Sequence, residues 1–251
     1  MGKILSVHSF RGGTGKSNTT ANLAAIYAQR GLKVGVVDTD IQSPGIHVIL
    51  GLEEERMVHS LNDYLWGKCE IRDAAHDVTP YLRAPVPGKV FLIPSSIKPG
   101  EIARVLREGY DADLLSDGFQ SIINTLKLDL LLIDTHPGLN EETLLSLAIS
   151  EVLVIIMRPD AQDYQGTSVT VDIARKLGVP NLFLVVNKVP QQFDMAAVRS
   201  RVEQTYSCEV AAVLPHSDDM MSLASSGVFS MQFPDHPVTR TYKLLAERIL
   251  K

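Results

Sequence analysis

Phe10-Arg11-Gly12-Gly13-Thr14-Gly15-Lys16-Ser17 is the stretch of this chain that decides the fold. The apolar run Ile4–His8 precedes it, as a buried strand would, and the segment Ser17–Arg30 after it has helical spacing. A strand, a glycine-rich loop and a helix N-terminus in this order offer free backbone N–H groups and the positive end of a helix dipole, which together bind phosphate. We therefore predict a phosphate site formed by Gly12, Gly13, Thr14, Gly15, Lys16, Ser17 and Asn18.

Two side chains of this loop have separate tasks. Lys16 can reach the β- and γ-phosphates of a nucleotide as a point charge, and the Ser17 hydroxyl is placed to bind Mg²⁺. A Gly-Lys-Ser sequence occurs by chance in many loops, but rarely between a buried strand and a helix.

Short apolar runs alternate with segments of helical spacing along the rest of the chain. The expected strands are Ile4–His8, Val34–Asp38, Val90–Pro94, Leu128–Asp134, Val152–Met157, Leu182–Asn187 and Val210–Leu214. The expected helices are Ser17–Arg30, Ser60–Trp66, Gly100–Leu106, Leu114–Lys127, Glu141–Ile149, Gln165–Leu177 and Met195–Tyr206. This alternation predicts an α/β fold, a doubly wound and mostly parallel sheet with helices on both faces, which binds ligands at the carboxyl ends of its strands.

Length and composition favour one domain. The chain has 251 residues, 45% of them hydrophobic, enough for one large core, so residues 1–251 are expected to form a single unit. The least regular part, residues 51–88, combines a charged run with several prolines and is interpreted as an insertion or a surface connection.

Charge and cysteine content exclude some classes of function. The net charge of −5 gives no overall attraction to nucleic acid or anionic lipid. Cys69 and Cys208 belong to no CxxC or Cys/His cluster, which argues against a zinc or iron–sulfur site and fits a reducing compartment. No apolar run approaches the ~20 residues of a membrane span. We therefore expect a cytoplasmic protein for which a membrane is not a partner.

Carboxylates follow two of the expected strands. Asp38 and Asp40 come after Val34–Val37, and Asp134 ends the apolar run that begins at Leu128. A carboxylate at the carboxyl edge of the sheet can hold a water of a Mg²⁺ shell, so Ser17, Asp40 and Asp134 are the candidate metal residues.

The phosphate loop departs from the usual Walker pattern, GxxxxGK[ST], because Phe10 occupies the position of the first glycine. The run Arg11–Ser17 instead resembles the deviant loop, KGGxGK[ST], of the MinD/ParA superfamily of P-loop ATPases. In that family the leading lysine reaches across a dimer interface to the partner's nucleotide. The resemblance implies this role for Arg11, although a planar, forked guanidinium is not geometrically equivalent to an ammonium.

Three further stretches carry the resemblance over nearly the whole chain. The segment Val36–Gly45 is similar to the family's DxD switch I, in which the residue matching Asp40 orients the attacking water. Asp134–Gly138 is similar to the Walker B and switch II sequence, commonly DTPPG. His136 stands where the family often has proline, and we interpret it as a variable loop residue rather than a general base.

The third stretch concerns the base of the nucleotide. Val185–Val189 resembles the family's adenine-side strand, so Asn187 is expected to pair with the adenine edge, which needs both a donor and an acceptor. Val213–Asp218 resembles the loop over the base, which implies base contacts from Pro215 and Asp218.

The resemblance implies an ATPase that dimerises with ATP and Mg²⁺ and that positions or partitions a cellular cargo. Lys16, Asp40 and Arg11 would be catalytic, basal hydrolysis slow, and an activating or cargo protein the partner. Two alternatives remain open: a metabolic ligase of related fold, similar to dethiobiotin synthetase, and a nucleotide-binding scaffold without turnover.

The last expected helix, Val238–Lys251, is the segment that could bind a membrane or DNA. Its apolar stripe of Val238, Tyr242, Leu245 and Ile249 is typical of core packing rather than of a membrane anchor. The opposite face carries Arg240, Lys243, Arg248 and Lys251. In the ParA branch such residues bind DNA without sequence preference, so nucleoid association is an open alternative to an ordinary solvated face.

Overall fold

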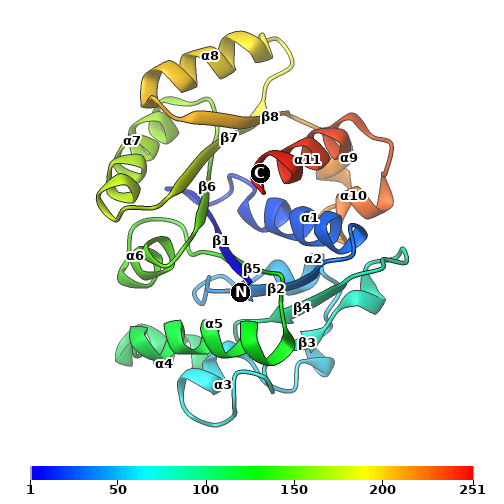
Figure 1. Cartoon of the computed structure of the whole chain (residues 1–251), viewed down its shortest axis with the longest axis vertical. Coiled ribbons are helices and arrows are strands. Elements are labelled where there is room, and N and C mark those ends of the chain that lie inside the picture. The colour runs from blue at the N-terminus through cyan, green and yellow to red at the C-terminus, as the bar shows by residue number, and fades with distance from the viewer. Residues whose placement is uncertain (1, 251) are drawn as a thin grey trace.

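The computed structural model describes residues 2–250 and contains an eight-stranded sheet in the order β3-β4-β2-β5-β1-β6-β7-β8 (Figure 1). The strands are β1 (Lys3–His8), β2 (Lys33–Asp38), β3 (His76–Asp77), β4 (Lys89–Ile93), β5 (Leu130–Asp134), β6 (Val152–Met157), β7 (Asn181–Val189) and β8 (Glu209–Pro215). All neighbours pair in parallel except β3 with β4. The predicted fold class, mostly parallel α/β, is confirmed.

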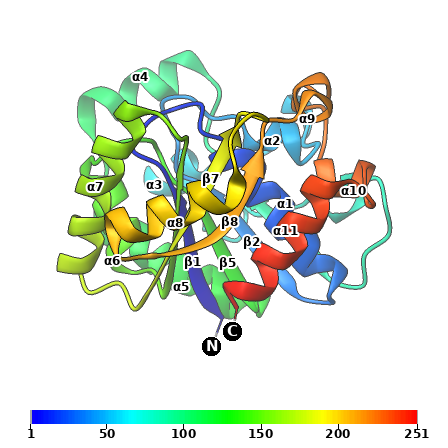
Figure 2. The same ribbon diagram turned by 90° about the horizontal axis from the view of Figure 1, so that it is seen from above.

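Helices cover both faces of this sheet (Figures 1 and 2). The α-helices are α1 (Lys16–Gln29), α2 (Ile46–Ile49), α3 (Leu61–Leu65), α4 (Pro99–Glu108), α5 (Ala112–Leu126), α6 (Glu141–Ala148), α7 (Ala161–Lys176), α8 (Met195–Tyr206), α9 (Asp218–Ser222), α10 (Phe229–Gln232) and α11 (Pro237–Arg248). Two short 3-10 helices are η1 (Glu54–Arg56) and η2 (Thr79–Tyr81). One hydrophobic cluster packs α1, α2, α10 and α11 on one face, and two others pack α3 to α8 on the opposite face.

The central strands are apolar on both sides because helices lie on both sides. Every residue of β5 and of β6 is buried. The parallel register aligns Val7 of β1 and Asp38 of β2 with Asp134 of β5. The carboxyl ends of β1, β2 and β5 therefore meet at one edge, where the phosphate loop follows β1.

The seven expected strands and the eight expected helices are all present, with ends displaced by a few residues. β3 and the short helices α2, α9 and α10 were not predicted, because elements of two to five residues are too short to show a periodicity. Residues 51–88 contain η1, α3, β3 and η2, and through β3 they extend the sheet beyond β4.

The apolar stripe of α11 packs into the core as expected. Val238, Tyr242, Leu245 and Ile249 are each at most 3% exposed. Between residues 2 and 250 there is no helix whose length and apolar character would let it cross a membrane.

Candidate functional site

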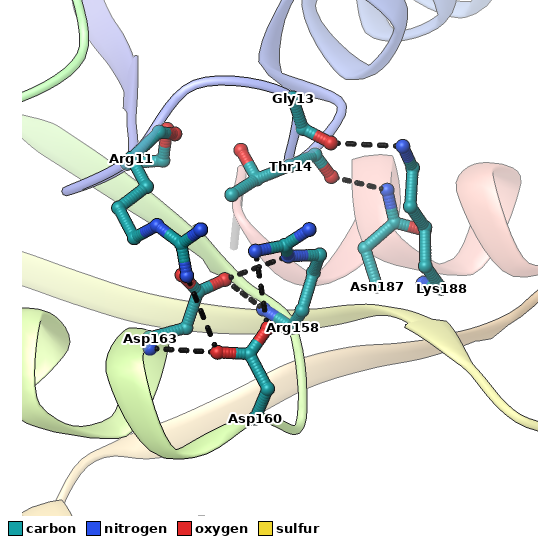
Figure 3. A network of polar contacts seen from close by, with 9 residues as sticks. Arg11, Gly13, Thr14, Arg158, Asp160, Asp163, Asn187 and Lys188 are labelled. Atoms are coloured by element: carbon teal, nitrogen blue, oxygen red, sulfur yellow. Dashed lines mark hydrogen bonds and ion pairs between the residues drawn. The ribbon is translucent and has the colours of Figure 1, made fainter.

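The phosphate loop is held by contacts to its carbonyl oxygens. The Asn187 side-chain amide donates to the carbonyl of Thr14 at 2.7 Å, and the Lys188 ammonium donates to the carbonyl of Gly13 at 2.8 Å (Figure 3). Gly15 is the N-cap of α1 with a left-handed φ of 104°, and no side chain caps the helix. A residue with a Cβ would be strained there and would also meet the Asn187 amide, so glycine is required. The uncapped N–H groups of α1 are thus left for a ligand.

Two adjoining cavities lie over this loop. One of about 320 Å³ is lined by Gly12, Gly13, Lys16, Ser17 and Asp40, among others. The second, of about 230 Å³, is lined by Asn187, Pro215, Ser217, Met220 and Met221, among others. Both include Gly15, Asn18, Lys188 and Ser225. We call the two cavities together the trough. Its phosphate end is the cavity lined by the glycine loop, and its other end is lined by the Asn187 amide, Met220 and Met221.

A wider hollow of about 990 Å³ lies between α8, β8 and α11, away from this loop. Its charged walls are already paired, since Arg248 forms an ion pair with Glu209 and Arg199 with Glu203. Within residues 2–250 no glycine lines it, and the helix start that does, Met195–Ala196 of α8, is already capped by the Asp194 side chain, so we place the candidate nucleotide site in the smaller trough.

Three carboxylates meet beside the trough. Burial raises the pKa of Asp134 to about 6, although the nearby Lys16 lowers it. Burial, and then the charges of Asp134 and Asp40, raise the pKa of Asp38 well above its ordinary value. Thr20 donates a hydrogen bond to Asp134 at 3.3 Å. The cluster therefore carries a negative charge that an added cation would stabilise.

Asp40 is oriented by contacts that the sequence did not reveal. Its Oδ1 atom accepts hydrogen bonds from His136 Nδ1 at 2.7 Å, from the Ser43 hydroxyl at 3.0 Å and from the Ser43 backbone N–H at 3.2 Å. The interpretation of His136 as a variable loop residue did not foresee this contact. The sequence did contain a signal for this contact: His136, a hydrogen-bond donor, stands where the family often has proline, two residues after the candidate metal residue Asp134.

Arg11 contacts acidic residues of its own chain. Its guanidinium lies 3.4 Å from a carboxylate oxygen of Asp160 and 3.4 Å from one of Asp163, at the start of α7 (Figure 3). The Arg11 side chain is 36% exposed, whereas that of Asp163 is only 2% exposed. Arg158 also pairs with both acids, at 3.1 and 3.2 Å. Four side chains thus form a charge-balanced cluster beside the phosphate loop.

A comparison with known families decides which kind of P-loop protein this is. The ParA model, described as NUBPL iron-transfer P-loop NTPase, matches residues 1–250. The chain belongs to the ParA family of P-loop NTPases. It thus lies within the MinD/ParA superfamily that the phosphate loop indicated.

Individual relatives of this ParA-family chain are distant. An uncharacterized ATP-binding protein of Methanocaldococcus jannaschii is 26% identical over 100% of this chain and 88% of its own length. The septum site-determining protein MinD of Thermotoga maritima is 23% identical over 99% of this chain and 88% of its own. The Mg-ADP complex of MinD from Pyrococcus horikoshii superposes with a TM-score of 0.79 at 21% identity, covering 100% of this chain and 97% of that one.

The iron-transfer description of the ParA model does not match the placement of this chain's thiols. Cys69 packs against the cluster under α3 and α5, and Cys208 against the cluster under α7 and α8. Both thiols are free. The fold thus places the two cysteines against different hydrophobic clusters.

The unusual Phe10 has a packing explanation in this ParA-family fold. A Cβ on Gly166 of α7 would overlap the Phe10 ring, so the ring lies directly against the α7 backbone. Phe10 thus takes up space beside a helical glycine, which shows how the loop tolerates a large residue where the Walker pattern has glycine.

The expected base-side residues Pro215, at the end of β8, and Asp218, after it, are placed differently. Pro215 lines the second cavity. Asp218 begins α9 with its side chain 87% exposed and pairs with His216 at 3.3 Å. Asp218 is not among the residues that line the trough, while Met220 and Met221, which the sequence did not single out, are.

Proposed function

We propose that this chain is an ATP-dependent dimerising switch ATPase that positions or partitions a cellular cargo, with ATP hydrolysis resetting the switch. The observation that carries the proposal is the trough of two adjoining cavities, because one is lined by the glycine loop, Lys16 and Asp40 and the other by the Asn187 amide. Membership of the ParA family supports it, as does the similarity to a MinD described as septum site-determining.

The contacts expected for ATP follow from the trough. The N–H groups between Gly12 and Asn18 and the Lys16 ammonium hold the phosphates. Adenine lies at the second end, between Pro215 and the methionines, whose flexible thioethers pack well on an aromatic ring. One N–H of the Asn187 amide donates to the carbonyl of Thr14, and its Oδ1 accepts from the Lys188 backbone N–H, which leaves the second N–H and one lone pair for the adenine edge.

Mg²⁺ fits the cluster of carboxylates at the phosphate end. No group of three or more His, Cys, Asp or Glu side chains in residues 2–250 is arranged to enclose a metal ion. Mg²⁺ in nucleotide sites, however, takes one or two protein ligands and completes its shell with phosphates and water. Ser17, Asp40 and Asp134 are the residues that would hold it, and its charge would neutralise the phosphates.

Hydrolysis in this site depends on positioning rather than on covalent chemistry. Lys16 stabilises negative charge on the transferred group, and Asp40 orients the attacking water. No arginine besides Arg11 lies in the phosphate loop, and Arg11 is turned toward Asp160 and Asp163. We therefore propose slow basal hydrolysis in the monomer.

Dimerisation would move Arg11 from its own chain to the partner's nucleotide. The cost of this move is small, because Arg158 still pairs with Asp160 and with the buried Asp163 after Arg11 has left. The ion pair of Arg11 with Asp160 joins two partly exposed side chains at 3.4 Å, so it contributes at most about 1 kcal/mol. The buried Asp163 keeps its shorter contact to Arg158 at 3.2 Å. A triphosphate on a second chain is the stronger partner for the guanidinium.

Arg11→Ala is expected to retain ATP binding as a monomer but to lose the ATP-induced dimer and the faster hydrolysis that accompanies it. A cation supplied across an interface contributes ~10³–10⁵ in rate in such enzymes. Arg11→Lys should restore part of both properties. Arg72→Ala, which removes an exposed arginine elsewhere, is the control and should dimerise and hydrolyse ATP like the wild type. Light scattering with a slowly hydrolysed ATP analogue measures the dimer. An Arg11→Ala protein that dimerises like the wild type would contradict the trans role.

Release of phosphate with ATP alone is the direct test of the activity. The switch ATPase should convert ATP to ADP and phosphate without a second substrate. The rate of phosphate release per subunit should rise with protein concentration as dimers form. Phosphate release that required a small carboxylic acid would instead identify the ligase alternative. Tight ATP binding with no release would identify the scaffold.

Random duplex DNA is expected to bind weakly, with or without ATP. The net charge of the chain is −5, and of the basic side chains of α11 Arg248 is neutralised by Glu209, while Arg240 and Lys243 are held against the carbonyls of Asp235 and Pro234. Fluorescence anisotropy at low salt measures this. ATP-dependent binding that falls steeply with salt would show that the dimer builds a basic surface from these residues and would favour nucleoid association.

A further inference from the structure

The loop residue His136 makes the shortest side-chain contact to Asp40. Its Nδ1 atom lies 2.7 Å from Asp40 Oδ1, and the two side chains are only 19% and 13% exposed. An ionised carboxylate can only accept, so the Nδ1 atom carries the proton in this contact. The two residues are 96 positions apart in sequence, and the bond joins the loop after β2 to the loop after β5.

The donors around Asp40 are unevenly distributed between its two oxygens. His136, the Ser43 hydroxyl and the Ser43 backbone N–H all donate to Oδ1. In residues 2–250 no hydrogen bond or ion pair to Oδ2 occurs, and Asp40 lines the phosphate end of the trough. Three donors on Oδ1 fix the plane of the carboxylate and leave Oδ2 as the acceptor for a water molecule.

His136 is itself held in place. The Thr143 hydroxyl of α6 donates to the His136 backbone carbonyl at 3.2 Å, and the N-cap Asn140 accepts from the Thr143 N–H at 2.9 Å. The imidazole is therefore presented to Asp40 from a loop anchored on the start of α6. A proline at position 136 would offer no side-chain donor.

We propose that His136 is a positioning residue for hydrolysis, which acts by donating from Nδ1 to Asp40 so that Oδ2 remains free to orient the attacking water. This inference rests on the proposed ATPase function. His136 does not take a proton from the water and does not contact the nucleotide. It lowers the number of orientations that the Asp40 carboxylate samples, and a water held in one orientation reacts faster.

Three substitutions of His136 distinguish the effect of a correctly placed hydrogen-bond donor from the effect of side-chain size. His136→Asn keeps an N–H donor at the same distance from the backbone as Nδ1, His136→Gln moves the donor one bond further, and His136→Ala removes it. We expect His136→Ala and His136→Gln to lower kcat about tenfold, with KM for ATP within about twofold of the wild type, and His136→Asn to recover most of kcat. A wild-type kcat in His136→Ala, or a His136→Gln protein as active as His136→Asn, would overturn the proposal.

A measurement without turnover separates this proposal from the proposed function. Long-range ¹H–¹⁵N correlation spectra of the nucleotide-free protein show which ring nitrogen of each histidine carries the proton, and His136→Asn assigns the signal. We expect the Nδ1–H form for His136 and its loss in Asp40→Ala. The Nε2–H form in the wild type would overturn the proposal even if ATP is hydrolysed. A protein that shows the Nδ1–H form but hydrolyses no ATP under any condition would overturn the ATPase function, and the positioning role with it.

Discussion

Lys16→Ala is expected to weaken ATP binding by at least ~100-fold, because it removes charge-assisted hydrogen bonds to two phosphates, each contributing about 1.5–3 kcal/mol. The N–H groups of α1 stay in place in this variant, but a helix N-terminus supplies only about half a charge against a triphosphate. Lys16 is 7% exposed, and the other lysine that lines the phosphate end of the trough, Lys188, is bonded to the carbonyl of Gly13. Titration calorimetry with Mg-ATP measures the loss.

The matched control for this variant is Lys33→Ala. Lys33 is an exposed lysine at the opposite end of β2 from Asp38, and its removal should leave ATP affinity unchanged. Lys16 also lowers the pKa of the buried Asp134, so Lys16→Ala should raise that pKa further. Thermal unfolding of both variants shows whether the fold is retained. A folded Lys16→Ala protein with wild-type affinity would remove the phosphate-loop assignment.

Asp40→Ala is expected to lower the rate of phosphate release by ~10²–10⁴ while ATP still binds, since the water loses its orienting carboxylate and the phosphate loop is intact. Calorimetry and a phosphate-release assay on the same sample separate the two effects. Asp219→Ala provides the control, because Asp219 is an acid of α9 with a side chain 66% exposed.

The stability of Asp40→Ala gives a second check on the acidic cluster. The Asp40 charge contributes to the raised pKa values of Asp38 and Asp134. A carboxyl group whose folded pKa lies above its unfolded value costs the folded state stability as pH rises above the unfolded pKa, and the loss is complete above the folded pKa. Removing Asp40 brings the pKa values of Asp38 and Asp134 closer to their unfolded values, which reduces this loss of stability. The nucleotide-free variant should therefore unfold at the same or a higher temperature than the wild type at pH 7 to 8. A large loss of stability would mean that Asp40 has a structural role, and the loss of turnover would then not identify its chemistry.

Much of the fold could be predicted because its signals are local. The apolar runs of β5 and β6 are short and flanked by helical segments, and this pattern alone indicates buried parallel strands. The glycine loop followed by α1 indicated the candidate phosphate site for the same reason, since backbone N–H groups that can bind phosphate come from consecutive residues. The short α9 and the two-residue β3 could not be predicted, because they contain too few residues for a period.

The contacts that set the chemistry of the site were decided by the tertiary structure. The Asp40–His136 and Arg11–Asp163 contacts join residues 96 and 152 positions apart. Which distant side chains meet depends on strand order and on the register that aligns β1, β2 and β5, and a sequence pattern with a period of two or 3.6 residues contains neither. The sequence by itself therefore determined the phosphate loop, the layered α/β fold and the carboxylates at the strand ends. The tertiary structure decided that Arg11 pairs within its own chain and that a histidine orients Asp40, because both depend on distances between segments that the chain brings together only on folding.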